Sequence, residues 1–384
     1  HRDLHSFPTR RSSDLGDGRL ELPAESFSVP AFSGAMTNAV RGAQGEGPVL
    51  VLADRMTAEP QPGETNRHNV VLQGGVTIQQ GEGGLRSREF LLQTEGAERA
   101  VRRAEAIGEV TIVRGLERMS CERAEYDAMG AYAEFSGGVG WQTRDRSGSA
   151  DRVWLDLAED HYRAEGAVRM RFEQAGGSWG GWLLPDGGTG SAEAGVGEGV
   201  VVGGGEPTEI ECDRFAYRGG RGVGSVPSAE YEGNVVVKQG DQLHMTCDSL
   251  RAQFDAGTNQ VRSVVAEERV ELRAADGSGY RLARGDRAVY SAVEDEVLLT
   301  GREGVEFFVI GPSGVSRGMG RQAVYRRATD SLVLAGDPTI TTPEGELKGN
   351  EVRLDRREGV LSATGPWRIR LPVGGGELPR LPGP

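Results

Sequence analysis

A short pattern of alternating apolar and polar residues, centred on a glycine, recurs along nearly the whole chain. It reads VLQGGVTI at residues 71–78, GEVTI at 108–112 and YEGNVVV at 231–237. Strict alternation is typical of a strand with one buried face, because successive side chains of a strand point to opposite sides. A helix would instead need apolar residues at every third or fourth position. The pattern therefore predicts an all-β chain.

A second pattern lies between the glycine-centred segments. It consists of a small residue, an acidic residue, often an arginine, and then apolar residues, as in CERAEYD at 121–127 and CDRFAY at 212–217. The apolar positions lie at −3 and −1 before the acid but at +2 and +4 after it, so the alternation slips by one residue there. Such a slip predicts a bulge or a corner at the acid. A strand that bends once per unit is what a sheet folded over into two walls requires.

The two patterns alternate over about nine copies. Anchor residues of the second pattern recur 29, 35 and 29 residues apart, from Tyr126 to Leu155, from Tyr290 to Tyr325 and from Tyr325 to Leu354. A period of this size is typical of stacked two-strand units, none of which can bury its apolar face alone. We therefore predict a repetitive antiparallel sheet of about nine two-strand units.

The repeats occupy residues 49–172 and 207–371. The intervening residues 173–206 are rich in glycine and lack the pattern, so we interpret them as a loop inserted in one hairpin. Long surface insertions cost little loop-closure entropy, and we expect that this one can be deleted without loss of the fold. Residues 16–48 are interpreted as an irregular N-terminal segment and residues 372–384 as a tail.

The first fifteen residues, HRDLHSFPTRRSSDL, differ in texture from the rest of the chain. They resemble the translation of sequencing-adaptor read-through, and we expect residues 1–15 to be a non-native leader. A true N-terminal signal or anchor is then expected to be missing from this chain.

The charge balance bears on the class of partner. The chain has 57 acidic and 44 basic residues, which gives a net charge of −13. Binding to nucleic acid needs a basic face that neutralises phosphates, so no nucleic-acid partner is expected. No stretch approaches the roughly 18 apolar residues of a membrane-spanning helix.

The alternation of G-x-V-x-[VIL] with [AC]-D-x-apolar-x-[YL]-D over residues 49–371 resembles the OstA-like family of lipopolysaccharide-transport proteins. That family comprises LptA, LptC and the N-terminal domain of LptD. The resemblance implies a slit-like β-jellyroll, or β-taco, whose apolar interior holds acyl chains. It also implies a periplasmic location, lipopolysaccharide with its lipid A as ligand, and other OstA-like components as partners through end-to-end sheet edges. Which member the chain matches, and whether it forms one slit or two in tandem, stays open.

The resemblance also implies which side chains would bind lipid. In the glycine-centred strands, alternation places apolar residues such as Val76 and Ile78 on one face, while their neighbour Thr77 points the other way. In a slit fold this face lines the cavity. The candidate lipid-binding residues are Val76, Ile78, Val110, Ile112, Val139, Trp141, Val168, Met170, Val235, Val237, Val270, Leu272, Val305 and Phe307.

Catalytic and metal chemistry find little support in the sequence. The three cysteines, Cys121, Cys212 and Cys247, occupy a position where other copies have alanine or glycine, which indicates small core residues. A disulfide between Cys212 and Cys247, from consecutive copies, is the alternative in an oxidising compartment. The histidines at 68, 161 and 244 are scattered, and no cluster has the spacing of a zinc site. We therefore expect no cofactor and no metal.

The acidic residues of the second pattern allow two interpretations. They could cap the turn at each strand corner, which we favour because most are followed directly by arginine, or they could form a calcium ladder. The residues concerned are Asp54, Glu122, Asp151, Asp213, Asp248 and Asp286.

Two other functional classes remain as alternatives to lipid transport. One is a structural β-solenoid of the cell surface, such as an adhesin stalk, in which the interior is simply core. The other is an enzyme on a solenoid scaffold, which would need a stacked cluster of Lys, Arg or His on an outer face. The sequence shows no such cluster, and we expect no enzyme activity.

Overall fold

The computed structural model describes fourteen ranges of the chain, and its structure is given for these alone. They are residues 19–22, 49–61, 67–96, 100–144, 146–156, 158–159, 161–173, 206–219, 225–241, 243–256, 261–276, 279–311, 314–355 and 360–371. Within them the chain forms strands and turns, as the alternation predicted, and no helix. Hence the described ranges hold no helix that could cross a membrane. The leader, the tail and nearly all of the predicted insertion lie outside these ranges.

The chain divides into two compact units. Unit 1 comprises His1–Arg144 and Ser149–Tyr162, and unit 2 comprises Asp145–Gly148 and Arg163–Pro384. The division falls within β9 (Arg146–Asp156) and β10 (His161–Phe172).

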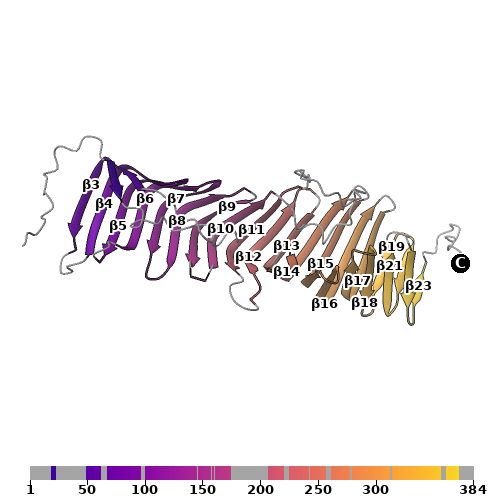
Figure 1. Cartoon of the computed structure of the whole chain (residues 1–384). Coiled ribbons are helices and arrows are strands. Elements are labelled where there is room, and N and C mark those ends of the chain that lie inside the picture. The colour runs from indigo at the N-terminus through magenta and orange to yellow at the C-terminus, as the bar shows by residue number, and fades with distance from the viewer. Residues whose placement is uncertain are drawn as a thin grey trace, which may run out of the picture. The chain divides into compact units, whose positions relative to one another are not determined.

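Unit 1 is an antiparallel sheet in which most strands pair with their neighbours in the chain (Figure 1). The strand β1 pairs with β2, and β2 pairs with β4. From β3 to β8 every strand pairs with the next. The strands are β1 (Arg19–Leu22), β2 (Val49–Leu52), β3 (Arg55–Pro60), β4 (Arg67–Gln80), β5 (Gly83–Glu95), β6 (Ala100–Arg114), β7 (Glu117–Asp127) and β8 (Tyr132–Gln142).

Unit 2 follows the same plan and ends in shorter strands. Its long strands are β11 (Thr208–Arg218), β12 (Ser228–Gln239), β13 (Leu243–Phe254), β14 (Val261–Asp276), β15 (Gly279–Ser291), β16 (Glu296–Gly311) and β17 (Gly314–Arg326), each paired with the next. The short strands are β18 (Ser331–Ala335), β19 (Thr339–Thr342), β20 (Gly345–Lys348), β21 (Glu351–Asp355), β22 (Val360–Thr364) and β23 (Arg368–Arg370). Two of them, β18 and β19, pair with the two halves of β17.

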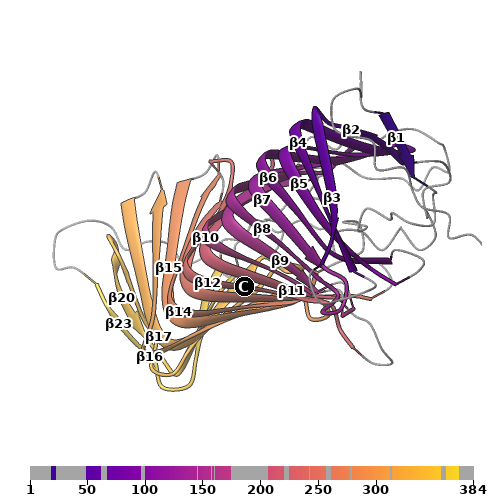
Figure 2. The ribbon, with the colours of Figure 1, turned by 90° about the vertical axis from the view of Figure 1, so that its left-hand side faces the viewer.

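The long strands bend once, at the glycine-centred position. Figure 2 shows the strands of unit 2 bending so that each contributes to two walls. We call the wall before the glycine the first wall and the wall after it the second wall. In the neighbouring acidic strands, which run antiparallel, residues before the acid belong to the second wall and residues after it to the first. The structure therefore confirms the predicted all-β antiparallel repeat with one corner per strand.

The corner is a β-bulge on the glycine-centred strand. In β12, Gly233 and Asn234 both have positive φ, 79° and 50°. Across this stretch the register shifts with both neighbouring strands, because β12 has one residue more than β11 and β13. The predicted slip at the acid is also present, since Cys212 and Phe215 are buried while the two residues between them are exposed. The sequence located the shift correctly, but the left-handed backbone lies on the opposing strand.

Packing of the acid explains why the corner requires glycine. A Cβ atom on Gly233 would lie 2.3 Å from the Oδ2 atom of Asp213, and one on Gly74 would lie 2.2 Å from Oδ2 of Asp54. At these two corners the carboxylate of the acidic strand therefore occupies the space beside the glycine of the next strand. At the corner of β12, the side chain of Asn234 also donates a hydrogen bond of 3.0 Å to Asp213. The acid and the glycine recur together because they pack against each other.

The two walls are in close contact near the corner. In β17, a Cβ atom on Gly318 would lie 2.9 Å from Leu334 of the first wall, and in β15 one on Gly285 would lie 2.9 Å from Leu299. Within the first wall, the rings of Phe215 and Tyr231, which are opposite each other on β11 and β12, lie 4.9 Å apart. Large side chains of one wall thus fill the space left by small residues of the other, as interior packing density requires.

Candidate functional site

The predicted lipid-binding residues face the interior in two rows. The first row follows the corner directly and is almost completely buried, at 0–2% exposure. It contains Val76, Val110, Val139, Val168, Val235, Val270 and Val305. The second row lies two residues further along each strand, nearer the end of the second wall that lies away from the corner, which we call its free edge. It contains Ile78, Ile112, Trp141, Met170, Val237, Leu272 and Phe307. All are buried except Phe307.

Phe307 is half-buried because its neighbours across the sheet are small. Its partners are Ala283 on β15 and Gly318 on β17. Neither can cover an aromatic ring from the side. The repeat pattern predicted the direction in which Phe307 points but not the size of its neighbours.

A small apolar cavity opens among second-row residues of unit 1. Its apolar lining includes Ile112, Met119, Trp141 and Leu155, and its volume is about 30 Å³. A cavity of this size has room for about two water-sized groups. This cavity by itself is too small for an acyl chain.

The cysteines are core residues. All three are free and buried, and burial raises the pKa of each of the Cys121, Cys212 and Cys247 thiols to about 12. The alternative of a disulfide between Cys212 and Cys247 is wrong. These residues lie on β11 and β13 with β12 between them, and two strand spacings of about 4.8 Å exceed the reach of a disulfide.

The histidines and acids are the remaining candidate metal ligands in the part of the chain that the structure describes. The described residues contain no group of three or more His, Cys, Asp or Glu side chains that could hold a metal ion. His244 lies opposite Lys238 and Arg273 on the adjacent strands. Burial, followed by the charges of Arg273 and Lys238, lowers its pKa. At the corners, Asp248 pairs with Arg269 and Asp286 accepts a hydrogen bond from the backbone of Arg302, which is the turn capping expected from the sequence.

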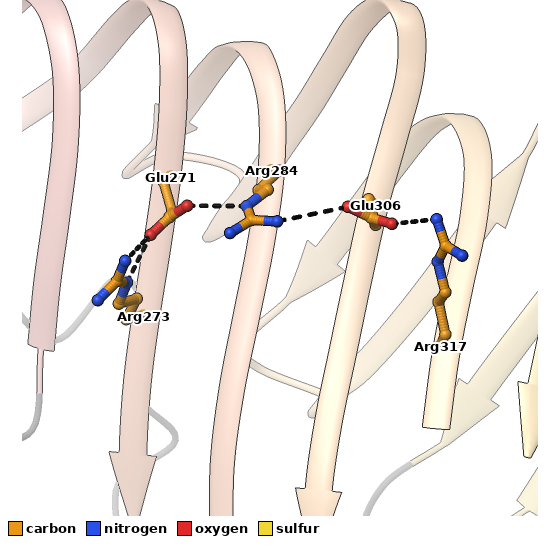
Figure 3. Close-up of polar contacts among 5 residues, drawn as sticks. All are labelled: Glu271, Arg273, Arg284, Glu306 and Arg317. Carbon is orange, nitrogen blue, oxygen red and sulfur yellow. Dashed lines mark hydrogen bonds and ion pairs between the residues drawn. The ribbon is translucent and has the colours of Figure 1, made fainter. Parts of the chain in front are cut away.

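A chain of ion pairs crosses the outer surface of the second wall in unit 2 (Figure 3). Glu271 accepts hydrogen bonds from Arg273 and Arg284, the latter at 2.8 Å. Glu306 in turn pairs with Arg284, at 3.7 Å, and with Arg317. Partial burial by itself would raise the pKa of Glu271, but the hydrogen bonds from Arg284 and Arg273 outweigh it and hold the pKa below its ordinary value. The sequence repeats did not predict these ion pairs, because the positions that face outward carry no residue type that recurs from copy to copy.

The strand β5 is a further copy of the acidic strand that the sequence pattern did not identify. It reads SREFLL at residues 87–92, with Arg88 in place of the acid. Ser87, Phe90 and Leu92 are buried, at −1, +2 and +4. Arg88 pairs with Glu109 at the next corner, so the charges are exchanged relative to Asp248 and Arg269. The spacing of apolar residues alone would have identified this copy.

Comparison with known proteins places these features in context. The family described as LptA/(LptD N-terminal domain) LPS transport protein matches residues 53–180 and 224–307, more than half of the chain. Among solved structures, LptH, described as the LptA homologous periplasmic component of the conserved lipopolysaccharide transport device from Pseudomonas aeruginosa, is similar at 14% identity. This similarity covers 44% of the present chain and 96% of LptH, with a TM-score of 0.23. No curated protein matches the sequence. The family match includes strands of both units.

Proposed function

Because the chain belongs to the LptA/(LptD N-terminal domain) family of lipopolysaccharide-transport proteins, we propose that it is a periplasmic carrier that holds lipopolysaccharide acyl chains between its two walls. The observation that supports this proposal is the double row of inward-facing apolar side chains, repeated on the glycine-centred strands of both units. Burial of a methylene group stabilises binding by about 0.8 kcal/mol, so a whole acyl chain would be held firmly. This role needs no catalytic group.

We place the acyl chain against the second row. First-row side chains such as Val235 have almost no exposed surface. Second-row side chains lie nearer the free edge, where the cavity beside Ile112 and Trp141 already separates the walls slightly. A modest opening of the free edge would admit lipid there without disrupting the corner.

The C-terminal end of unit 2 supports a proposal about partners. Trp367, directly before the strand β23, and Ile369 within it are 63% and 52% exposed, although their equivalents in β12, Val235 and Val237, are completely buried. The strand β23 pairs with β20 along one edge. Another OstA-like component could add its strand to the other edge and cover these side chains by β-augmentation. We propose this end-to-end pairing as the way in which the carrier joins a longer bridge.

The packed first row also favours the competing hypothesis of a structural solenoid with a filled interior. Photo-cross-linking with lipopolysaccharide distinguishes the two hypotheses. A photo-reactive residue at Ile112 or Met170 should label lipid, whereas one at the adjacent outward positions Thr111 or Arg169 should not. Val235 should label weakly. The fold of each variant is checked by circular dichroism.

Absence of labelling from all of these positions would show that the interior is filled and would support the solenoid. Equal labelling from inward and outward positions would show that lipid only coats the surface. Either result would contradict the carrier proposal.

A further inference from the structure

An exposed apolar surface lies on the outer face of the second wall in unit 2, at the hairpin between β16 and β17. Ile310 and Val315 are directly opposite each other and are 46% and 53% exposed. Alternation from the inward-facing Val305 and Phe307 turns Phe308 and Ile310 outward. Tyr280 of β15 lies opposite Ile310 on the other side. We call Ile310 and Val315 the apolar tip.

The ion-pair chain of Figure 3 lies on the same outer face, and its arginines are more exposed than its glutamates. Arg273, Arg284 and Arg317 are 47–49% exposed, whereas Glu271 and Glu306 are 19% and 23% exposed. Each glutamate lies between two arginines, so it orients the guanidinium groups while remaining partly covered.

One arginine connects the two features directly. The guanidinium of Arg317 lies 5.6 Å from the ring centroid of Phe308, and Arg317 is directly opposite Phe308 in the register between β16 and β17. Apolar residues at the tip and a row of guanidinium groups behind it therefore belong to one continuous face.

We propose that this outer face docks on an anionic lipid surface. Ile310 and Val315 enter the interfacial region, and the guanidinium groups of Arg273, Arg284 and Arg317 contact lipid phosphates. Aliphatic side chains beside basic ones are typical of surfaces that bind the membrane interface, and guanidinium groups suit the fork geometry of phosphate. This lipid contact is on the outside of the sheet and is independent of acyl chains held between the walls.

Charge complementarity favours an anionic lipid as the occupant of this face. Three half-exposed arginines adjoin the apolar tip, and their guanidinium groups match the phosphates of a lipid headgroup. The chain as a whole carries a net charge of −13, so its attraction to anionic lipid must be local. Local attraction of this kind is screened within about 8 Å at physiological ionic strength, and binding should weaken with added salt.

Vesicle sedimentation with the full chain tests the proposal. Vesicles of phosphatidylcholine alone are compared with vesicles containing about one third phosphatidylglycerol. We expect binding to the anionic vesicles, and about a tenfold loss for the double variant Ile310→Ser/Val315→Ser. The matched control is Val293→Ser, which removes an exposed aliphatic side chain from the turn between β15 and β16 and should leave binding unchanged.

The cationic part is tested separately by Arg284→Gln/Arg317→Gln, with Arg251→Gln on the first wall as the control. Thermal melting shows whether each variant is folded. The first pair should weaken binding and reduce its dependence on salt, and the control should do neither.

Three results would overturn the proposal. These are absence of binding to anionic vesicles, equal binding to neutral vesicles, and equal loss in Val293→Ser. Sedimentation velocity provides a fourth test, since self-association that disappears in Ile310→Ser/Val315→Ser would show that a second copy of the chain covers this face.

Discussion

The same repeat takes two forms within unit 2, as the strand β12 and the pair β18 and β19 demonstrate. In β12 the chain passes through its corner as one continuous strand from Ser228 to Gln239. At the later corner it breaks into β18 and β19. Yet the corner residues have nearly the same backbone, with φ of 79° and 50° in β12 and of 77° and 56° at Gly336 and Asp337. The corner conformation is therefore a local property, whereas continuity of the strand is not.

Two differences account for the break. The residue that follows the corner is Val235 in β12 but Pro338 in the later copy, and proline has no N–H group with which to continue the ladder. The next glycine-centred copy also carries a proline, Pro366, at its corner. Toward the end of the sheet the inner face also loses its cover, as the exposure of Trp367 and Ile369 shows. Burial and ladder bonds together keep the central strands continuous.

The largest expected contrast is between Val235→Asp and Trp367→Asp. Both positions directly follow a corner, but Val235 is completely buried and Trp367 is mostly exposed. An unpaired buried charge should lower the free energy of unfolding by about 3–5 kcal/mol in the first variant. The second should change it little. Urea denaturation measures both, and similar losses would show that the two ends of unit 2 are packed alike.

Thiol reactivity gives the next largest contrast. Burial raises the pKa of Cys247 to about 12 from an ordinary value of 9, which reduces the thiolate fraction about a thousandfold. The equivalent residue near the C-terminus is Gly349, where an added Cβ would meet its neighbours at 3.4–3.6 Å, an ordinary contact. We expect Gly349→Cys to react rapidly with Ellman's reagent in the native protein while the three natural cysteines do not. Rapid reaction of the unmodified chain would contradict their assignment to the core.

A smaller effect is expected from the corner glycines. Gly233→Ala forces a side chain into the left-handed region, which costs about 1–2 kcal/mol, and adds a contact with Asp213. In Gly233→Ala/Asp213→Ala the contact is absent and part of the stability should return. Gly336→Ala has the same backbone cost, but we expect its effect in hydrogen exchange of β18–β23 rather than in the main unfolding transition. Equal shifts of the main transition would mean that these strands unfold with the centre.

The smallest effect on stability is expected from the surface ion pairs. Those of Glu271, in the ion-pair chain, are compared with the single pair of Glu346 and Lys348, 3.3 Å apart near the C-terminal end of unit 2. Because the pKa of Glu271 is lowered, its ion pairs contribute stability above the ordinary carboxyl pKa, and this contribution is lost as the pH falls through the lowered value. Glu271→Gln should therefore destabilise the protein by less than about 1 kcal/mol near neutral pH and have no effect in acid. Glu346→Gln should have no measurable effect at either pH. Thermal melting at both values checks this.

The sequence predicted the inner face well because the same residue types recur there. The alternation predicted that residues such as Val235 and Ile112 face inward, and it located the register slip at the acid. The acidic pattern did not identify β5 as a member of the series, because Arg88 replaces the acid, although the spacing of its apolar residues fits. The sequence could not predict that Phe307 is only half-buried. Outward-facing residues, including the apolar tip and the ion-pair chain, follow no repeat. The contacts among these outward-facing residues depend on which strands pair and in which register, and only the structure gives that information.

From β3 to β8 and from β11 to β17, each strand pairs with the next one along the chain. Forming each new hairpin therefore closes only a short loop, and the entropy cost of each step is small. A chain delivered one end first can add every strand to the growing edge as it arrives, without waiting for distant residues. At each moment during such assembly, the template that the chain presents to its surroundings is the single strand most recently added.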